Sequence, residues 1–237
     1  MYKKKSLGQH FLHNRHYLGM VADAADITKG ETVLEIGPGE GALTHVLLER
    51  GAKVVAIEKD SRLMSVLQEK FDKEIKNKTL EVIEGDALEF EPKFKNYKVV
   101  GNIPYYITGA LFKKFLSGTR QPSLLVFLIQ KEVAERIARS KKESILSLSV
   151  KAYGEPKYIK TVPAGAFVPP PKVDSAILLV SNVSRKNFKN VAHEENFFDL
   201  IKKAFGSKRK MLRSTLGIDS SERPEDLTLE QWLALSK

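Results

Sequence analysis

TVLEIGPGEG, residues 32–41, is an apolar run rich in β-forming residues that leads directly into three glycines at alternate positions. Residues 32–36 predict a strand, and the amphipathic residues 42–50 that follow predict a helix. At such a turn, glycine lets a ligand approach the backbone closely, where a Cβ would block it. The turn has neither the G-x-G-x-x-G spacing of dinucleotide sites nor the Gly-Lys-Ser/Thr ending of P-loops. It therefore predicts a ligand without a pyrophosphate, and the alternative is an ordinary tight turn.

The rest of the chain repeats this alternation of short apolar runs with amphipathic stretches, which is typical of an α/β fold with a mostly parallel sheet. Strands are predicted at residues 32–36, 53–57, 80–83, 97–101, 123–129, 157–162 and 175–180. Helices are predicted at residues 42–50, 61–71, 110–116, 131–138, 145–152, 196–205, 208–216 and 229–235. The composition becomes polar and basic after Ser181. We expect a catalytic domain at residues 1–182 and a small helical, basic domain at residues 183–237 that packs on it.

Composition narrows the class of protein further. The 237 residues include 39 Lys and Arg against 29 Asp and Glu, a net charge of +10 that favours a polyanionic partner. The absence of cysteine excludes disulfides, thiolate zinc sites and cysteine nucleophiles. The longest apolar run, residues 124–129, is far shorter than the roughly 20 residues that span a bilayer. We expect a cytoplasmic monomer with no membrane contact, and no histidine pair indicates a metal.

Two acids follow the next two predicted strands. Glu58 directly follows the second predicted strand, and Asp86 follows the third after Glu84 and Gly85. A carboxylate at the first position can accept both hydroxyls of a ribose, and one at the second position can accept an adenine amino group. These residues predict S-adenosylmethionine as the cofactor, whereas the alternative role for each acid alone is a strand-end cap.

Motifs along essentially the whole chain resemble those of the ribosomal RNA adenine N6-dimethyltransferases. They are QHFL at 9–12, EIGPGEG at 35–41, Glu58, GDA at 85–87, NIPY at 102–105 and FVPPPKVDS at 167–175. The resemblance implies a class I methyltransferase (Rossmann-like) fold that binds S-adenosylmethionine. The cofactor residues expected from the motifs are Gln9, His10, Leu12, Glu35, Gly37, Gly39, Gly41, Glu58, Asp86, Ala87 and Asn102. In the family, residues 9–12 close over the methionine end of the cofactor; His10 replaces the commoner Asn and is not expected to act as a general base.

The NIPY segment suits chemistry on an amino group. The N6 lone pair of adenine is delocalised, and acceptors around the amino group favour the pyramidal form that attacks a methyl group. We expect the Asn102 side-chain oxygen and the Pro104 carbonyl to be those acceptors. Tyr105 and, by the resemblance, Phe167 are expected to stack on the flipped base. The alternative is that Tyr105 is a core aromatic and Pro104 only forms a turn.

Basic residues at both ends of the chain predict phosphate contacts, although a solvated charged face is the alternative. The candidates are Lys3, Lys4, Lys5, Lys208, Arg209, Lys210 and Arg213. Residues 163–167 and 204–216 resemble the small-subunit enzymes, which dimethylate two adjacent adenines in the 3′-terminal hairpin of 16S rRNA within an immature 30S subunit. The alternatives are a 23S rRNA adenine N6-methyltransferase of the macrolide-resistance type and a non-catalytic RNA-binding or transcription factor on the same fold.

Overall fold

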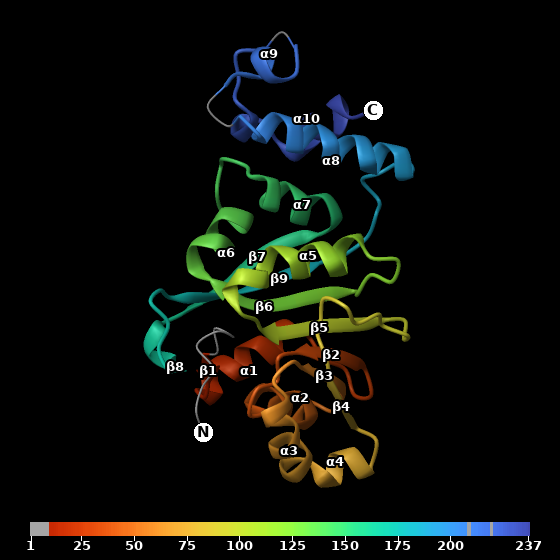
Figure 1. Ribbon diagram of the computed structural model, residues 1–237, viewed down its shortest axis with the longest axis vertical. Coiled ribbons are helices and arrows are strands. Elements are labelled where there is room, and N and C mark those ends of the chain that lie inside the picture. Colours follow the sequence, from red (N-terminus) through yellow and green to blue (C-terminus); the bar gives the residue numbers. More distant parts are fainter. Residues whose placement is uncertain (1–9, 208–209, 219) are drawn as a thin grey trace.

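The structure is a computed structural model that describes residues 10–207, 210–218 and 220–237 (Figure 1). Its centre is a seven-stranded sheet in the order β4-β3-β2-β5-β6-β9-β7. The strands are β2 (Thr32–Ile36), β3 (Lys53–Glu58), β4 (Leu80–Glu84), β5 (Tyr97–Asn102), β6 (Leu124–Gln130), β7 (Glu155–Val162) and β9 (Ser175–Ser181). The five neighbouring strands β4, β3, β2, β5 and β6 pair in parallel. Strand β9 runs antiparallel to both β6 and β7. The mostly parallel sheet expected from the sequence is confirmed.

Helices cover both faces of this sheet. They are α1 (Arg15–Ala24), α2 (Ala42–Glu49), α3 (Ser61–Lys70), α4 (Asp72–Lys76), α5 (Thr108–Ser117), α6 (Lys131–Ala138) and α7 (Ile145–Tyr153). Alternate residues of β2 serve two cores: Val33 packs in the core with Leu18 of α1 and Leu43 of α2, while Leu34 packs in the core with Phe112 of α5. Because side chains of a strand alternate between faces, a fully buried strand can be apolar on both.

The C-terminal segment forms α8 (Val191–Phe205), α9 (Leu212–Thr215), a 3₁₀ turn (Pro224–Asp226) and α10 (Leu229–Leu235) at one end of the molecule (Figure 1). Its buried residues do not form an apolar core of their own. Phe197 of α8 and Trp232 of α10 belong to the same apolar core as Leu148 and Tyr153 of α7. The segment therefore depends on α7 for its burial.

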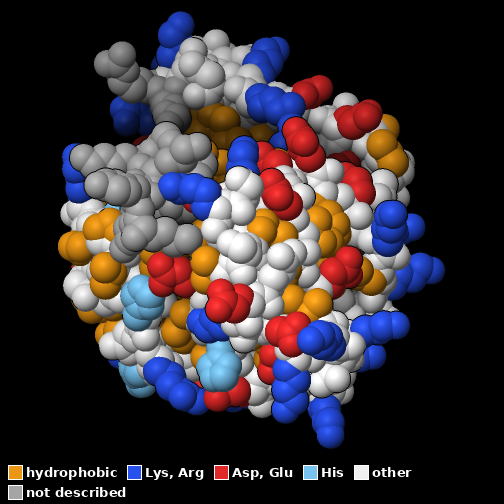
Figure 2. All heavy atoms as spheres, turned by 60° about the horizontal axis from the view of Figure 1, so that its bottom comes forward, with side chains coloured by type: hydrophobic (Ala, Val, Ile, Leu, Met, Phe, Trp, Pro, Cys, Tyr) orange, Lys and Arg blue, Asp and Glu red, His pale blue; other side chains and the backbone are white. Residues whose placement is uncertain are grey.

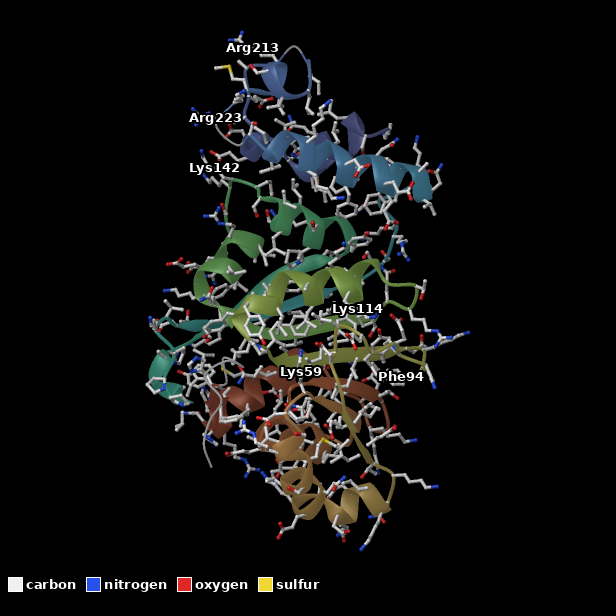
Figure 3. All side chains as sticks on the ribbon, viewed as in Figure 1. Lys59, Phe94, Lys114, Lys142, Arg213 and Arg223 are labelled. Atoms are coloured by element: carbon white, nitrogen blue, oxygen red, sulfur yellow. The ribbon has the colours of Figure 1, made fainter. Side chains whose placement is uncertain are left out.

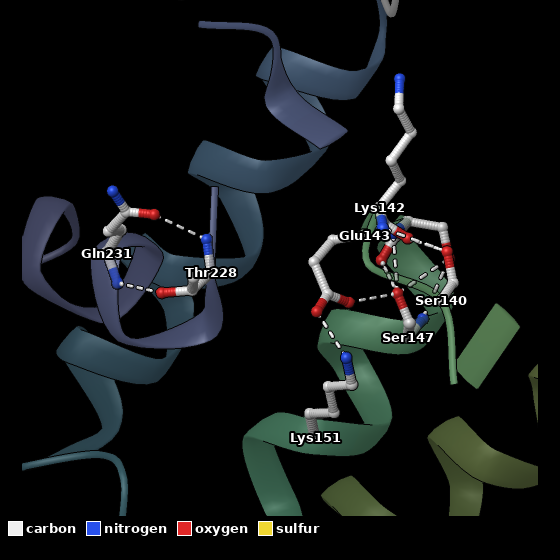
Figure 4. Close-up of polar contacts among 8 residues, drawn as sticks. Ser140, Lys142, Glu143, Ser147, Lys151, Thr228 and Gln231 are labelled. Atoms are coloured by element: carbon white, nitrogen blue, oxygen red, sulfur yellow. Dashed lines mark hydrogen bonds and ion pairs between the residues drawn. The ribbon is translucent and has the colours of Figure 1, made fainter. Parts of the chain in front are cut away.

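Polar contacts at the start of α7 reinforce this junction (Figure 4). The Ser147 hydroxyl donates to Glu143 Oε2 at 2.7 Å, and Lys151 forms an ion pair with the same carboxylate. The Glu143 amide donates to the Glu225 carbonyl at 2.7 Å, which joins the α6–α7 loop to the C-terminal turn. Glu143 is only 9% exposed, so its charge is held by these partners rather than by water.

The structure differs from the sequence-based expectations in several elements. Helix α1 was not predicted, and α9 is shorter than the helix predicted at residues 208–216. Two very short strands, β1 (Phe11–Leu12) and β8 (Phe167–Val168), pair with each other outside the main sheet. Among the described residues, no helix combines the length and apolar character needed to cross a bilayer.

Candidate active site

A cleft opens where β2, β3, β4 and β5 end, at their carboxyl edge, which is where open α/β sheets bind ligands. His10 and Phe11, near the start of the described chain, and Phe167 of β8 also line it. The lining residues are His10, Phe11, Ile36, Gly37, Gly39, Ile57, Glu58, Lys59, Gly85, Asp86, Ala87, Asn102, Ile103, Pro104, Tyr105, Tyr106, Ile107 and Phe167. Most of the residues expected from the motifs therefore meet in one cavity, although they come from segments far apart in the sequence.

The glycine turn shapes the floor of this cleft. Gly37, Gly39 and Gly41 all have positive φ, at 66°, 60° and 77°, a region that L-residues with a Cβ rarely adopt. A Cβ on Gly39 would lie 2.7 Å from the Phe11 ring, and one on Gly41 would lie 2.4 Å from the Phe71 ring. Gly41 caps α2 and lies outside the cleft lining. The protein's own packing therefore requires glycine at positions 39 and 41.

Glu58 stands at the end of β3, 5% exposed, with its carboxylate anchored by the backbone. Its Oε2 accepts from the Gly39 amide at 3.0 Å and its Oε1 accepts from the Asp60 amide at 2.8 Å. Burial raises the pKa of this carboxyl in spite of these hydrogen bonds. Since each carboxylate oxygen can accept two hydrogen bonds, both oxygens keep capacity for the hydroxyls of a diol.

Asp86 lies at the same edge, after β4. Its Oδ1 accepts from the Leu88 amide at 2.9 Å, and Lys59 Nζ lies 2.6 Å from Oδ2. The hydrogen bond from Lys59 lowers the pKa of the Asp86 carboxyl. Figure 3 shows Lys59 near the middle of the molecule, at this edge of the sheet. Lys59 was missed by sequence reasoning, because a single lysine after a strand has no distinguishing pattern.

Apolar residues form the wall between the two acids. Ile57, Ala87 and Ile103 are each less than 10% exposed and line the cleft. Apolar side chains together with carboxylate acceptors suit a purine with an amino group, joined to a ribose.

Glu35 occupies a different place from Glu58 and Asp86. It is 1% exposed, accepts from the Thr44 hydroxyl at 2.7 Å, and lines a smaller cavity behind the glycine turn. Leu12, Gly37 and Asn102 line the same cavity. Burial raises the pKa of Glu35 to about 8, and repulsion from the Glu58 carboxylate contributes to the same shift. The residue can receive a cationic group there, but it is not on the wall of the main cleft.

Asn102 ends β5 with its side-chain amide held in one orientation. Its Nδ2 donates to the His10 carbonyl at 2.8 Å. A carbonyl can only accept, so the NH₂ group faces His10 and Oδ1 remains an acceptor. The Pro104 carbonyl accepts from the Ile107 amide at 3.2 Å and has a second lone pair. Two acceptors of the NIPY segment thus stand beside the cleft.

Tyr105 and Phe167 both line the cleft, as expected for residues that hold a base. The Tyr105 hydroxyl shares a hydrogen bond of 2.7 Å with Ser175 Oγ, and burial raises its pKa. Phe167 is only 2% exposed and pairs with Leu12 across the β1–β8 ladder. This ladder, which sequence reasoning missed, brings the N-terminal segment and the Pro-rich loop together over the cleft.

Part of the predicted nucleic-acid surface can be placed. Lys3, Lys4, Lys5, Gln9, Lys208 and Arg209 lie outside the described residues. Lys210 and Arg213 are exposed on the C-terminal segment. Figure 3 shows Arg213 at the same end of the molecule as Arg223 and Lys142, two basic residues that were not singled out in the sequence. Lys142, Arg213 and Arg223 are so far apart in the sequence that counting charges within a short stretch does not group them.

The face turned forward in Figure 2, which includes the α3–α4 end, has a different character: acidic and basic side chains are intermixed there. The described ranges contain no group of three side chains that could hold a metal ion.

The family described as ribosomal RNA adenine dimethylase matches residues 1–231. The ribosomal RNA small subunit methyltransferase A of Dehalococcoides mccartyi is 38% identical over 256 residues, which cover 98% of this chain and 87% of that protein.

Solved structures with a high overall similarity include a dimethyladenosine transferase from Plasmodium falciparum and the 23S rRNA methyltransferase ErmE. The first has a TM-score of 0.84 and 29% identity, and covers 95% of this chain and 96% of its own. The second has a TM-score of 0.79 and 27% identity, and covers 95% of this chain and 98% of its own.

Proposed function

The chain belongs to the ribosomal RNA adenine dimethylase family, and from this premise we propose that it methylates adenine N6 in 16S rRNA with S-adenosylmethionine as the methyl donor. The observation that carries the proposal is the single cleft in which Glu58, Asp86 and the NIPY segment meet. Glu58 and Asp86 offer acceptors for a nucleoside, and Asn102 offers an acceptor for an amino group.

The cleft residues fit the cofactor by their chemistry. The backbone-anchored Glu58 carboxylate is suited to the ribose hydroxyls, and Asp86 with the Ile57, Ala87 and Ile103 wall is suited to the adenine. Glu35 and the small cavity behind the glycine turn are suited to the cationic amino group of the methionine part. When bound, S-adenosylmethionine supplies an electrophilic methyl group.

The chain's own residues then act on the substrate amino group. Asn102 Oδ1 and the Pro104 carbonyl accept its two hydrogens, which localises the nitrogen lone pair and orients it. Tyr105 and Phe167 hold the flipped base by stacking. No carboxylate base is required, since the alkylated nitrogen is acidic enough to release its proton to water.

The same family membership supports a compartment, a target in the RNA, a substrate particle and an oligomeric state. We place the reaction in the cytoplasm, on two adjacent adenines of the 3′-terminal hairpin, in an immature 30S subunit, with the protein acting as a monomer. Residues 183–237 form the RNA-binding domain, for which the exposed Lys210 and Arg213 give support. Positive charge near the phosphate backbone supplies affinity, whereas the cleft selects the base.

The alternative with a specific observation behind it is a 23S rRNA methyltransferase, because ErmE has a closely similar fold. The relative named as a small-subunit methyltransferase favours 16S rRNA, since it is 38% identical against 27% for ErmE. Transfer of a labelled methyl group to unmethylated small and large ribosomal subunits, followed by mapping of the modified base, distinguishes the two. We expect label in dimethyladenine of the small subunit, and label confined to the large subunit would overturn the proposal.

A further inference from the structure

Among the described residues, the lining of the main cleft contains one lysine, Lys59, and no arginine. Lys59 directly follows Glu58 at the end of β3 (Figure 3). Its Nζ lies 2.6 Å from Asp86 Oδ2, and the Lys59 side chain is 60% exposed. Because an exposed ion pair contributes little to stability, the needs of folding alone explain little of this contact.

The contact places a donor and an acceptor side by side at the edge of the cleft. An ammonium group has three N–H donors, and the hydrogen bond to Asp86 uses one of them. The Asp86 carboxylate is also held through its other oxygen, since Oδ1 accepts from the Leu88 amide at 2.9 Å. The hydrogen bond to Asp86 raises the pKa of Lys59, so its ammonium group stays charged. A ligand at this edge therefore meets a charged donor next to a charged acceptor.

Adenine carries the complementary groups on one edge. Its N6 amino group donates and its N7 accepts, and proteins read these two groups with a side chain that has both functions, such as Asn or Gln. Lys59 and Asp86 offer the same two functions from two side chains. Guanine has an acceptor oxygen at position 6, which the Asp86 carboxylate would repel. The pair is therefore suited to adenine.

The place of Lys59 in the chain favours N7 over N1, the other ring acceptor beside the amino group. The preceding residue, Glu58, is suited to the ribose hydroxyls. N7 belongs to the five-membered ring that carries the ribose, whereas N1 lies on the far side of the six-membered ring. A side chain that starts next to Glu58 and reaches Asp86 therefore follows the edge of the base that contains N7.

We propose that Lys59 donates a hydrogen bond to N7 of the cofactor adenine while Asp86 accepts one from the adenine amino group. This inference rests on the proposed use of S-adenosylmethionine and leaves the roles of Glu58 and Asp86 unchanged. It adds Lys59 to the cofactor site as a residue that determines which nucleoside is bound.

Binding of S-adenosylhomocysteine, the product form of the cofactor, tests this contact without catalysis. Calorimetry compares this compound with its 7-deaza analogue, in which a C–H group replaces N7. The full-length protein is measured beside Lys59→Met, which keeps a side chain of similar length without the donor. We expect the analogue to bind the unaltered protein about 5-fold or more weakly, as for a hydrogen bond from a charged donor at a partly exposed site. The affinities of Lys59→Met for the two compounds should agree within about twofold.

Two controls separate the contact from general effects. Lys53→Met removes an exposed lysine at the opposite end of β3, and it should discriminate between the compounds as the unaltered protein does. The 1-deaza analogue lacks N1 in place of N7. Its loss of affinity is expected to be the same in the unaltered protein and in Lys59→Met.

Three results would overturn the inference. They are equal affinity of the unaltered protein for S-adenosylhomocysteine and its 7-deaza analogue, an undiminished difference between these compounds in Lys59→Met, and a loss that depends on Lys59 with the 1-deaza analogue instead. Failure of the proposed function gives a separate result, because the unaltered protein would then bind none of the three compounds.

Discussion

The Thr44 hydroxyl donates a 2.7 Å hydrogen bond to Glu35 Oε2, and both side chains are buried behind the glycine turn. The bond does not compensate for burial, which raises the pKa of Glu35 from 4.5 to about 8. An acid whose pKa is higher in the folded than in the unfolded chain stays protonated in the folded state over the pH range between the two values. Its contribution to stability is therefore complete below about pH 4.5 and is lost as pH rises to about 8.

Glu35→Gln is expected to remove this pH dependence. The amide keeps an acceptor for Thr44 and cannot ionise, so the free energy of unfolding at pH 8 should exceed that of the unaltered protein by on the order of 1 kcal/mol or more. At pH 5 the two proteins should differ little. Urea unfolding at both pH values checks this, with Glu81→Gln as the control at an exposed position. Equal differences at pH 5 and pH 8 would show that Glu35 ionises normally in the folded protein.

Glu58→Ala is expected to weaken binding of S-adenosylmethionine by about 10-fold or more, since the ribose loses a charged acceptor and the Gly39 and Asp60 amides lose theirs. Affinity for RNA should stay close to that of the unaltered protein. Calorimetry measures the first quantity and a filter-binding titration the second. Glu84→Ala is a matched control, because Glu84 is exposed and pairs with Glu58 in the register of the neighbouring strand. Unchanged cofactor affinity in Glu58→Ala would remove this residue from the ribose site.

Gly41→Ala is expected to destabilise the fold by more than about 1 kcal/mol, because the residue has φ of 77° and a Cβ would lie 2.4 Å from the Phe71 ring. Gly19→Ala should act in the opposite direction. Gly19 lies inside α1 with nothing within 4 Å of the added Cβ, so alanine should stabilise the helix by about 0.5–1 kcal/mol. Thermal unfolding of both variants provides the comparison. Equal effects of the two substitutions would contradict the conformation described for the glycine turn.

Charge reversal at Lys210 and Arg213 is expected to weaken binding to small subunits and to flatten its dependence on salt concentration, because phosphate contacts release counterions. The same two changes at Lys53 and Lys73, which are exposed on β3 and α4 away from the C-terminal segment, should have little effect. Titrations at several salt concentrations compare the two double variants. Similar losses in both would indicate a response to net charge and not to a defined RNA surface.

Much of the fold could be predicted because each strand is marked by a short apolar run in the sequence. The runs at Val33 to Ile36 and at Leu124 to Ile129 are apolar enough to identify, and both strands formed where expected. Their order and direction depend on packing between distant segments, so the antiparallel placement of β9 could not be read from periodicity. Helix α1 did leave a signal: Asn14 caps it by accepting from the His16 amide, and Leu18, Val21 and Ala22 follow at helical spacing.

In the candidate site, too, residues marked by their place in the sequence could be predicted, and contacts between distant segments could not. Glu58, Asp86 and Asn102 could be found because each ends or follows a strand, and parallel strands place such residues at one edge. Lys59 and the β1–β8 ladder could not be found, because their roles arise from contacts between segments. Arg185 illustrates the limits of counting charges, since its guanidinium pairs with Glu194 and donates to the Ser117 carbonyl. His193 lies in the polar C-terminal part of the sequence, yet it is buried against Leu233 and Ser236.

The rate of methyl transfer to small subunits by Asn102→Ala, in a single turnover at saturating S-adenosylmethionine, shows whether Asn102 acts on the reacting amino group. Asn102→Ala removes the Oδ1 acceptor and the hydrogen bond to His10 while leaving β5 intact. With Asn77→Ala at an exposed helix end as the control, we predict at least about a 100-fold slower transfer, with folding and cofactor binding retained. A rate equal to that of the unaltered protein would contradict the assignment of this cleft as the site of adenine methylation.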